Sequence, residues 1–412
     1  MRRVYRAAWV LPIDAPPIRD GWVVIDGEHI VDVGQGAAPD LAEAAGALTD
    51  LGSAAVMPAL TNAHTHLELS WLRGRVPPGN NFITWVTDQM RLRLSPGGQA
   101  DDQAVRAAMR AALDEMTRSG TGVAGDISNS LAGLDLLECS GLAGVVFHEI
   151  LKFDVTDADA FVARARERID RSSGGPRWRL SLAPHAPYSV SPGTFEAIRA
   201  WREPGREIPT AVHVGESPEE MELLATGRGG WRTMLEHLCA WNPGWVAPGC
   251  GPVEYLDRLG FWDPRTLAVH GVQVSDRDLA LLATRGATLV TCPRSNVYVG
   301  VGDPPAARFF ASGVRVAVGT DSLASVPDLN LFSELAELRR LAPAVRPRDL
   351  LASATVNGAA ALGLDDRFGT IAPGKRAALI AVAVPAGVPD VEQYLVSGIS
   401  PEQVSWIAPP SC

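Results

Sequence analysis

Eight short apolar runs between residues 58 and 360 each end in polar residues, and longer amphipathic stretches lie between them. The first run is MPALTNAHTH and the last is VRVAVGTDS, while DDQAVRAAMRAALDEMTRSG is typical of the stretches between runs. Near-continuous apolar strands suit a parallel sheet that is covered on both faces. Eight strand-then-helix units are what a (β/α)8 barrel requires. The sequence therefore predicts an α/β fold, with a TIM barrel over residues 58–361.

Both ends of the chain carry a different pattern, in which short apolar runs alternate with turn residues. Near the N-terminus these runs are WVLPI, GWVVIDG and HIVDVG, and near the C-terminus GTIAPGKRAALIAVAVP returns to the same pattern. We expect residues 1–57 and 362–412 to form one small, discontinuous β-sandwich domain beside the barrel.

One long insertion interrupts the alternation. Residues 217–262 separate two strand runs by more than a simple crossover needs. Such an insertion at the carboxyl face of a barrel is often an active-site lid. A surface excursion packed on the outside of the barrel is the alternative, and the sequence leaves both open.

The charge and cysteine content disfavour several classes of protein. The net charge of −10 argues against a nucleic-acid binder and against a binder of anionic membranes. No run of about 18 apolar residues is present, so no membrane-spanning helix is expected. The five cysteines form no CxxC pair, which is typical of reduced thiols in a cytoplasmic protein. We expect a small-molecule substrate as partner, and a homo-oligomer is compatible with the sequence.

Histidines and an aspartate stand at the ends of the predicted strands, on the face where barrel enzymes place their active sites. His64 and His66 end the first run, and because residues i and i+2 of a strand point to the same side, both imidazoles can reach one point. Later runs add His213 at the end of the fifth with Glu216 three residues on, His270 at the end of the sixth and Asp321 at the end of the eighth. A lone histidine at a strand end is usually structural, but the joint pattern predicts a metal centre for zinc or for iron or manganese.

The pattern resembles the amidohydrolase superfamily, and within it the branch of cytosine deaminases, chlorohydrolases and adenosylhomocysteine or aminofutalosine deaminases. The resemblance covers nearly the whole chain and includes a late turn, GTIAPGKRAA at residues 369–378, in which Ala378 replaces the usual aspartate. It implies a deaminase-type aminohydrolase with one divalent metal, zinc first and iron as the alternative. It implies these roles: His64, His66, His213 and Asp321 as metal ligands, and Glu216, His270 and Asp321 as catalytic residues.

These residue types fit the activation of water. Three neutral imidazoles leave a metal strongly Lewis acidic, so that its water can ionise near neutral pH. Glu216 would accept a proton from that water and deliver it to a ring nitrogen of the substrate. His270 would orient the attacking oxygen or stabilise the tetrahedral intermediate, and Asp321 would combine ligation with proton acceptance.

The scarcity of lysine favours one metal over two. Two-metal relatives bridge their ions with a carbamylated lysine near the end of the fourth strand, where this chain reads LSLAPHAPYS. The two lysines of the chain, Lys152 and Lys375, lie after the third run and in the closing β segment.

Four further residues are predicted to contact the substrate. By the resemblance, His185 meets a ring nitrogen of the base, with a structural role as the alternative. Arg294 ends the seventh run and could hold a substrate carboxylate bidentately, with a surface ion pair as the alternative. Glu68 either faces the pocket or pairs with an arginine. Trp85 belongs to a motif that the family writes F-x-E-W.

The chain departs from the family at that motif. It reads Phe82-Ile83-Thr84-Trp85, so the glutamate with which adenosine-type relatives bind ribose is replaced by threonine. We expect a deaminase of an aminated N-heterocycle or purine nucleoside, an aminodeoxyfutalosine-type nucleoside being one candidate. A hydrolase of cyclic amides or of carbon–chlorine bonds is the alternative. A non-catalytic scaffold is disfavoured, because none of the six expected site residues is missing.

Overall fold

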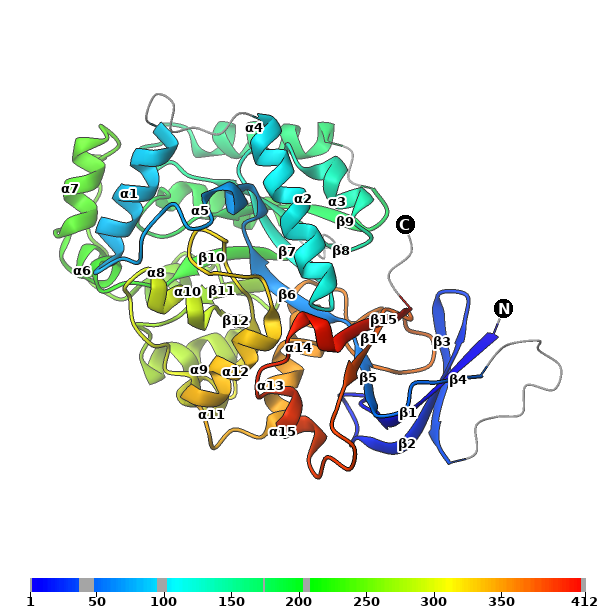
Figure 1. Ribbon diagram of the computed structural model, residues 1–412. Helices are drawn as coiled ribbons and strands as arrows, with labels where there is room; N and C mark the ends of the chain where they lie inside the picture. Colours follow the sequence, from blue (N-terminus) through cyan, green and yellow to red (C-terminus); the bar gives the residue numbers. More distant parts are fainter. Residues whose placement is uncertain (1, 37–47, 95–101, 173–174, 203–207, 409–412) are drawn as a thin grey trace.

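Two four-stranded parallel sheets form the centre of the molecule (Figure 1). The computed structural model describes residues 2–36, 48–94, 102–172, 175–202 and 208–408. Each of the eight apolar runs contains one strand of these sheets. The first sheet has the order β6 (Leu60–Thr65), β7 (Thr121–Ser128), β8 (Ala143–Ile150) and β9 (Trp178–Pro184). The second has the order β10 (Thr210–Val214), β11 (Thr266–His270), β12 (Thr288–Thr291) and β13 (Arg315–Val318).

Isolated contacts join the two sheets at both of their edges. At one edge, Thr65 forms a parallel bridge with Asp321, just beyond β13. At the other edge, the amide of His213 donates a hydrogen bond of 2.9 Å to the carbonyl of His185, just beyond β9. Continuous strand pairing, however, stays within each sheet over the described residues. The expected parallel α/β fold is therefore present as two adjoining sheets.

One buried apolar cluster fills the space that the two sheets share. It includes a side chain from every one of the eight strands: Ala63, Val123, Val145, Ala183, Ala211, Leu267, Val290 and Ala317. Full burial of a valine or leucine side chain stabilises a fold by about 1.5–3 kcal/mol. Because the cluster crosses from one sheet to the other, it holds both sheets around a common interior.

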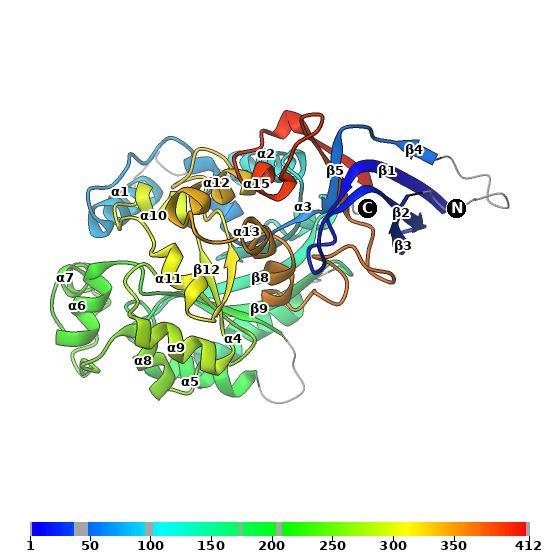
Figure 2. The ribbon, with the colours of Figure 1, turned by 90° about the horizontal axis from the view of Figure 1, so that it is seen from below.

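Helices connect the strands and lie on the outer sides of the sheets (Figures 1 and 2). The local sequence defines their ends: α9 begins after Ser275, whose side chain forms a capping box with Asp278, and ends at Gly286 in the left-handed region with φ 72°. The helices outside the insertion are α1 (Phe82–Leu94), α2 (Asp102–Arg118), α3 (Leu134–Cys139), α4 (Ala158–Arg171), α5 (Pro192–Trp201), α9 (Asp276–Arg285), α10 (Pro293–Tyr298), α11 (Ala306–Ala311), α12 (Leu331–Leu341), α13 (Pro347–Ser353), α14 (Val356–Ala361) and α15 (Val391–Leu395), with short 3-10 helices η1 (Leu67–Leu72) and η2 (Pro401–Gln403).

Both ends of the chain build a third, mixed sheet of seven strands. Its order is β15 (Val404–Ala408), β14 (Leu379–Ala383), β5 (Ala54–Pro58), β1 (Arg2–Val10), β2 (Ile18–Asp26) and β3 (His29–Gln35), and β4 (Leu48–Asp50) pairs with β1. The N- and C-terminal segments thus meet in one sheet, as the sequence pattern indicates. All seven strands pair within that single sheet, and a second sheet facing it, which a sandwich needs, is not identified among the described residues.

The insertion forms three helices between β10 and β11: α6 (Pro218–Thr226), α7 (Gly230–His237) and α8 (Pro252–Arg258). Figures 1 and 2 both show α6 and α7 at the end of the molecule opposite the mixed sheet, with α1 nearby. The rings of Phe82 in α1 and Trp231 in α7 lie 5.8 Å apart. The insertion therefore reaches across to the segment that follows β6.

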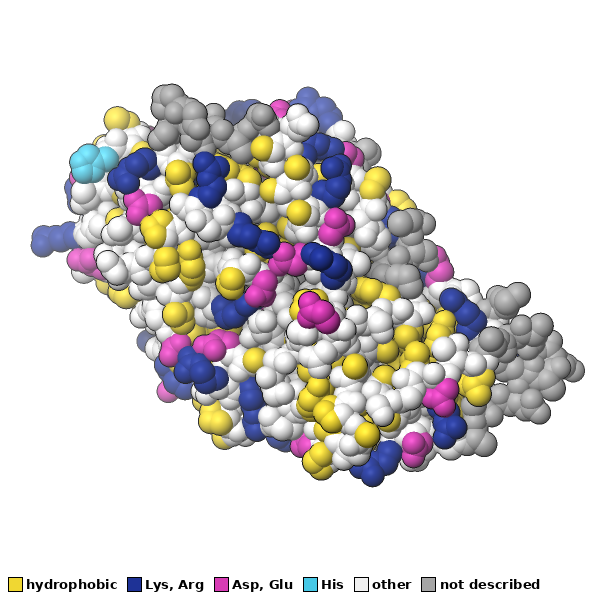
Figure 3. Space-filling model, in the orientation of Figure 1, with side chains coloured by type: hydrophobic (Ala, Val, Ile, Leu, Met, Phe, Trp, Pro, Cys, Tyr) yellow, Lys and Arg dark blue, Asp and Glu magenta, His cyan; other side chains and the backbone are white. Residues whose placement is uncertain are grey.

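The surface carries charges of both signs. Basic and acidic side chains are interspersed over the face shown in Figure 3. None of the described helices is both long and apolar enough to cross a lipid bilayer.

Candidate active site

Three imidazoles from the two sheets face one another at the carboxyl ends of the strands. His64 lies in β6, His66 directly follows that strand, and His213 lies in β10. The Nε2 of His64 is 3.2 Å from the Nε2 of His66 and 3.3 Å from the Nε2 of His213. Nitrogens placed about 2.0 Å from a tetrahedral zinc ion would lie about 3.3 Å from one another. Both measured distances fit neighbouring corners of one coordination sphere, and the ligand atoms of all three histidines lie within 4.8 Å of one another.

The surroundings of these imidazoles favour their neutral form. Burial lowers the pKa of His64 and of His213 well below the usual value, and neighbouring imidazoles lower it further. Burial also lowers the pKa of His66. The Nδ1 of His213 lies 2.9 Å from the carbonyl oxygen of His185, which holds the ring with Nε2 toward His64. A neutral imidazole held in this way offers the lone pair that a metal ligand needs.

Asp321 adds a carboxylate beside the imidazoles. Its Oδ1 lies 3.6 Å from the Nε2 of His66 and 4.0 Å from the Nε2 of His64. Its Oδ2 accepts a hydrogen bond of 2.6 Å from the hydroxyl of Ser295, which orients the group. Asp321 also has φ 61°, a strained conformation for a residue other than glycine that is typical of functional sites. Three imidazoles and one carboxylate are a donor set that suits a divalent metal.

A second group of potential ligands shares one of these histidines. Ligand atoms of Glu149, His185 and His213 all lie within 4.8 Å of one another. However, the Nδ1 of His213 is occupied by the carbonyl of His185, and Oε2 of Glu149 accepts a hydrogen bond of 2.8 Å from the amide of Asn129. An ion in this second group would have to replace the His185 carbonyl at the Nδ1 of His213, because the Nε2 of His213 faces His64 in the first group. The geometry thus favours the first group over the second.

Glu216 and His270 lie together next to the imidazole cluster. The Oε1 of Glu216 is 3.6 Å from the Nε2 of His270, and both side chains are buried. The Nδ1 of His270 lies 2.9 Å from the Oδ1 of Asn296, so the ring presents Nε2 to the carboxylate. Burial, and then the charges of Asp321 and Glu220, raise the pKa of Glu216 well above its usual value. A buried carboxyl group with a raised pKa is suited to taking up a proton and passing it on.

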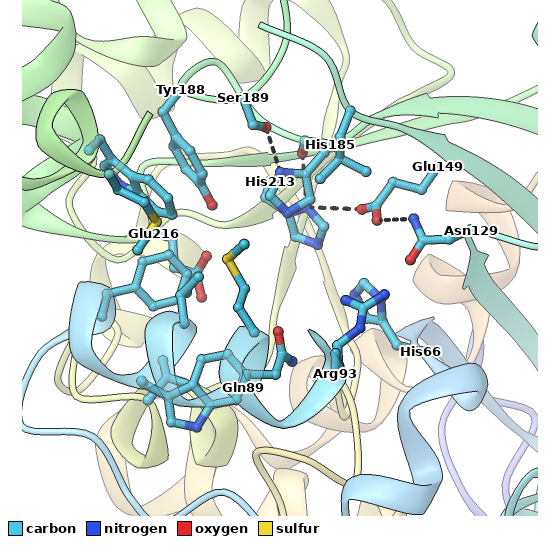
Figure 4. A pocket seen from close by; sticks show the side chains of 18 of the residues that line it. His66, Gln89, Arg93, Asn129, Glu149, His185, Tyr188, Ser189, His213 and Glu216 are labelled. Atoms are coloured by element: carbon cyan, nitrogen blue, oxygen red, sulfur yellow. Dashed lines mark hydrogen bonds and ion pairs between the residues drawn. The ribbon is translucent and has the colours of Figure 1, made fainter. Parts of the chain in front are cut away.

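A cavity of about 370 Å³ opens onto these residues, which is a volume in the range of small-molecule sites. Figure 4 shows His66, His185, His213 and Glu216 around this cavity. Aromatic side chains form much of one wall, where the rings of Tyr188 and Trp231 stack 4.0 Å apart. Trp231 belongs to α7, so the insertion contributes to the cavity.

Two of the four predicted substrate contacts line this cavity. They are His185 and Trp85. Burial lowers the pKa of His185 to about 3, so its imidazole is neutral, and its Nδ1 lies 2.6 Å from the hydroxyl of Ser189.

The other two predicted contacts are engaged elsewhere. Arg294 is bound on both sides, with Nε 2.7 Å from Glu334 and Nη2 2.9 Å from Asp328. Its guanidinium is thereby committed to a largely buried ion-pair network, and not to the cavity. Glu68 accepts hydrogen bonds from the hydroxyls of Ser128 and Ser130 and so fastens the loop after β7. Neither predicted role of Glu68, in the pocket or with an arginine, matches this arrangement.

Glu149, Gln89 and Arg93 all line the cavity, but the sequence analysis did not single them out. Glu149 is the penultimate residue of β8, and Gln89 and Arg93 lie in α1, away from any strand. The spacing of Trp85, Gln89 and Arg93 by four residues is the signal that could have identified them, because such residues share one face of a helix.

Comparison with known proteins decides the family. Residues 55–401 match the model of the Amidohydrolase family, which covers both parallel sheets, the insertion and every site residue named above. The chain belongs to the amidohydrolase family. Membership of this family, together with deaminase relatives, makes it a hydrolase that acts on carbon–nitrogen bonds.

Relatives of this amidohydrolase include several nucleoside deaminases. It is 33% identical over 357 residues to the aminodeoxyfutalosine deaminase of Deinococcus radiodurans, covering 83% of this chain and 81% of the relative. It is 31% identical over 403 residues to the 5-methylthioadenosine/S-adenosylhomocysteine deaminase of Desulforudis audaxviator, covering 92% and 84%. Among solved structures, an adenosine deaminase from Xanthomonas campestris with bound zinc aligns with a TM-score of 0.81 at 29% identity, covering 97% of this chain and 90% of that one.

Proposed function

We propose that this amidohydrolase removes the exocyclic amino group of a purine nucleoside, with release of ammonia. The observation that carries the proposal is the placement of the Glu216–His270 pair beside the three converging imidazoles, in one cavity. A hydrolytic deaminase needs these two elements together: a site that activates water, and a buried acid that can protonate a ring nitrogen. The deaminase relatives support a nucleoside as the substrate.

The metal site of the proposal uses His64, His66, His213 and Asp321. When bound, one divalent ion would supply the Lewis acidity that lets a water molecule ionise near neutral pH. Zinc is the first choice because three nitrogens and one carboxylate suit it, and because the solved adenosine deaminase carries zinc. Iron would be held by the same donors.

The chain's own residues would then move the protons. Glu216 takes a proton from the attacking water and gives it to the ring nitrogen next to the amino-bearing carbon. Nε2 of His270, whose ring is fixed by Asn296, stabilises the developing oxygen of the substrate. Asp321 accepts the second proton and returns it to the leaving amine. His185 and Trp85 position the base within the cavity.

The proposal extends to the architecture around the site. We infer that the two parallel sheets close into one (β/α)8 barrel, since a single apolar cluster draws on all eight strands. We also propose residues 58–361 as the catalytic domain, residues 1–57 with 362–412 as the small domain, and the insertion at 217–262 as a cover over the cavity. Contact between Phe82 and Trp231 supports the last of these.

Ammonia release from metal-replete protein tests the proposed function. The panel contains adenosine-type nucleosides, free aminated purines and pyrimidines, cyclic amides and chlorinated triazines. We expect ammonia from nucleosides, and no ring opening or chloride release from the last two groups. Turnover of cyclic amides or triazines without turnover of any nucleoside would overturn the proposal.

A further inference from the structure

A second cavity, of about 310 Å³, lies between the mixed sheet and the first parallel sheet. On one side it is lined by the turn after β2 and by the end of β15, and on the other by Ala143 and Arg177. Ala143 is the first residue of β8, and Arg177 directly precedes β9. At about 3.3 Å per residue, Ala143 is about 20 Å along β8 from Glu149, which lines the active-site cavity. The second cavity is therefore separate from the imidazole cluster, which lies at the carboxyl ends of the strands.

Arginine dominates the polar lining of this second cavity. Arg3, Arg177, Arg367 and Arg376 line it, and Glu28 is the one carboxylate among the described residues of the lining. Glu28 forms an ion pair with Arg376. A single carboxylate thus faces four guanidinium groups, in a chain whose net charge is −10. We call this cavity the basic crevice.

Arg367 carries the clearest sign of a missing ligand. Its side chain is half-buried, and its Nε is buried without a hydrogen-bond partner among the described residues. The carbon of its guanidinium lies 5.3 Å from the centre of the Phe368 ring. The carbonyl of Arg367 accepts the backbone N–H of Arg376 at 2.9 Å, which keeps the two arginines adjacent. A buried donor without an acceptor is destabilising, so an acceptor supplied from outside the chain would satisfy it.

Like charges surround Arg367. Burial lowers the pKa of Arg367 and the charge of Arg179 lowers it further, while Asp366 raises it and Arg376 again lowers it. Arg179 is itself held nearby, because its Nη1 donates a hydrogen bond of 3.1 Å to the carbonyl of Gly363. A guanidinium is not deprotonated in proteins, so the fold keeps several positive charges close together at this place. An anion between them would relieve the repulsion.

The chemistry of the basic crevice suits a phosphate group. Guanidinium groups bind phosphate oxygens through two parallel N–H donors. A phosphate monoester carries about two negative charges near neutral pH, so it balances more of the arginine charge than a carboxylate would. The volume of the crevice is at the lower end of small-molecule sites, and Phe368, Ala377 and Ala378 give it an apolar part. There is room for a small organic group beside the phosphate.

We propose that the basic crevice binds phosphate, either as the free ion or as the monoester of a small molecule. Arg367 and Arg376 hold the phosphate oxygens, and Arg3 and Arg177 add positive charge around them. The site goes beyond the proposed function and does not rest on it, since none of these arginines lines the active-site cavity. Because its residues come from the mixed sheet and from the first parallel sheet, a bound phosphate ties the two sheets together and stabilises the folded chain.

Calorimetric titration with inorganic phosphate, at an ionic strength held constant with chloride, tests the site. We expect saturable binding to the wild type and binding about 10- to 100-fold weaker in Arg367→Gln, the effect of one charged hydrogen bond. Arg3→Gln, at an exposed position, should weaken binding by about 2- to 5-fold, and it provides the same test if Arg367→Gln does not fold. Arg348→Gln is the matched control, because Arg348 is also half-buried but lies outside the crevice, and it should bind phosphate as the wild type does.

A second titration, with glycerol 3-phosphate, distinguishes the two sources of phosphate. Tighter binding of the ester identifies a phosphorylated small molecule as the ligand, and tighter binding of inorganic phosphate identifies the free ion. Either result supports the site when Arg367→Gln weakens the binding and ammonia release stays at the wild-type rate in that variant. The proposal is overturned if neither probe binds the wild type saturably, or if Arg367→Gln and Arg3→Gln both bind as the wild type does, since the phosphate would then occupy another place, such as the metal ligands. An equal loss in Arg348→Gln also overturns it.

Discussion

The Nε2 atoms of His213 and His64 lie 3.3 Å apart, although 149 positions separate the two residues in the chain. Two parallel strands in different sheets bring them together, and the carbonyl of His185 fixes the orientation of the His213 ring. Two neutral imidazoles at this distance gain little from each other, because each presents a lone pair to the same point. The divalent ion that we propose at that point would account for the placement of both rings.

The first prediction concerns metal content. His213→Asn should lose the metal, because only two imidazoles and Asp321 remain, whereas wild-type protein should retain about one ion per chain. His185→Asn is the matched control, since the rings of His185 and His213 lie 4.9 Å apart but His185 is outside the first ligand group. Elemental analysis after gel filtration measures both. Equal metal loss in the two variants would contradict the ligand assignment and would favour the group that contains Glu149.

Glu216→Gln should separate metal binding from turnover. The amide keeps the size of the side chain but cannot accept and donate the proton, so kcat should fall by about 100- to 10,000-fold, while metal content stays at the wild-type level. Glu222→Gln, at an exposed position in α6, is the control and should keep its activity. Ammonia release and elemental analysis of the same samples provide the readout. Normal turnover in Glu216→Gln would show that another group transfers the proton.

The sequence predicted the site residues best where their positions depend on the periodicity and order of the strands. His64 and His66 share a side of one strand because they are two residues apart, and the ends of parallel strands meet at one face, so the positions of His213, His270 and Asp321 followed from the order of the strands. All eight apolar runs do contain strands.

Side chains whose partners come from distant helices could not be placed in this way. Arg294 follows a strand, yet its guanidinium turns to Asp328 and Glu334, which are 34 and 40 residues further along the chain. Nothing in the sequence around Arg294 marks those partners. Arg93 could not be placed from strand order, because it lies in a helix, α1, that follows an irregular segment. Whether Arg93 faces the cavity depends on how that helix packs.

Arg294 should matter for stability. Replacing it by methionine leaves Glu334, whose side chain is fully buried, without its cation, and breaking such a pair costs about 3–5 kcal/mol of unfolding free energy. Arg308→Met is the control, because Arg308 and Asp276 form an exposed pair that contributes about 0–1 kcal/mol. Chemical denaturation of both variants measures the difference. Equal stabilities for the two, with a raised KM in Arg294→Met alone, would return Arg294 to a role in substrate binding.

Glu220 should make stability depend on pH in a particular direction. Burial raises its pKa to about 8 in the folded chain from the ordinary value of 4.5, while its carboxylate accepts the backbone N–H of Glu216 at 3.0 Å. A raised pKa means that the folded state holds the proton more tightly than the unfolded state. The contribution of Glu220 to stability is therefore fully present below about pH 4.5 and is lost as the pH rises toward about 8.

Glu220→Gln removes this titration while keeping an amide oxygen for the Glu216 N–H. The unfolding free energy of the wild type should fall relative to that of the variant between about pH 5 and about pH 8, and the two curves should run parallel above that range. Glu222→Gln serves again as the control, and its curve should follow the wild type throughout. Denaturation midpoints across this pH range give the comparison. Parallel curves for Glu220→Gln and wild type over the whole range would mean that Glu220 is ionised in the folded chain, with a counter-charge near Glu216.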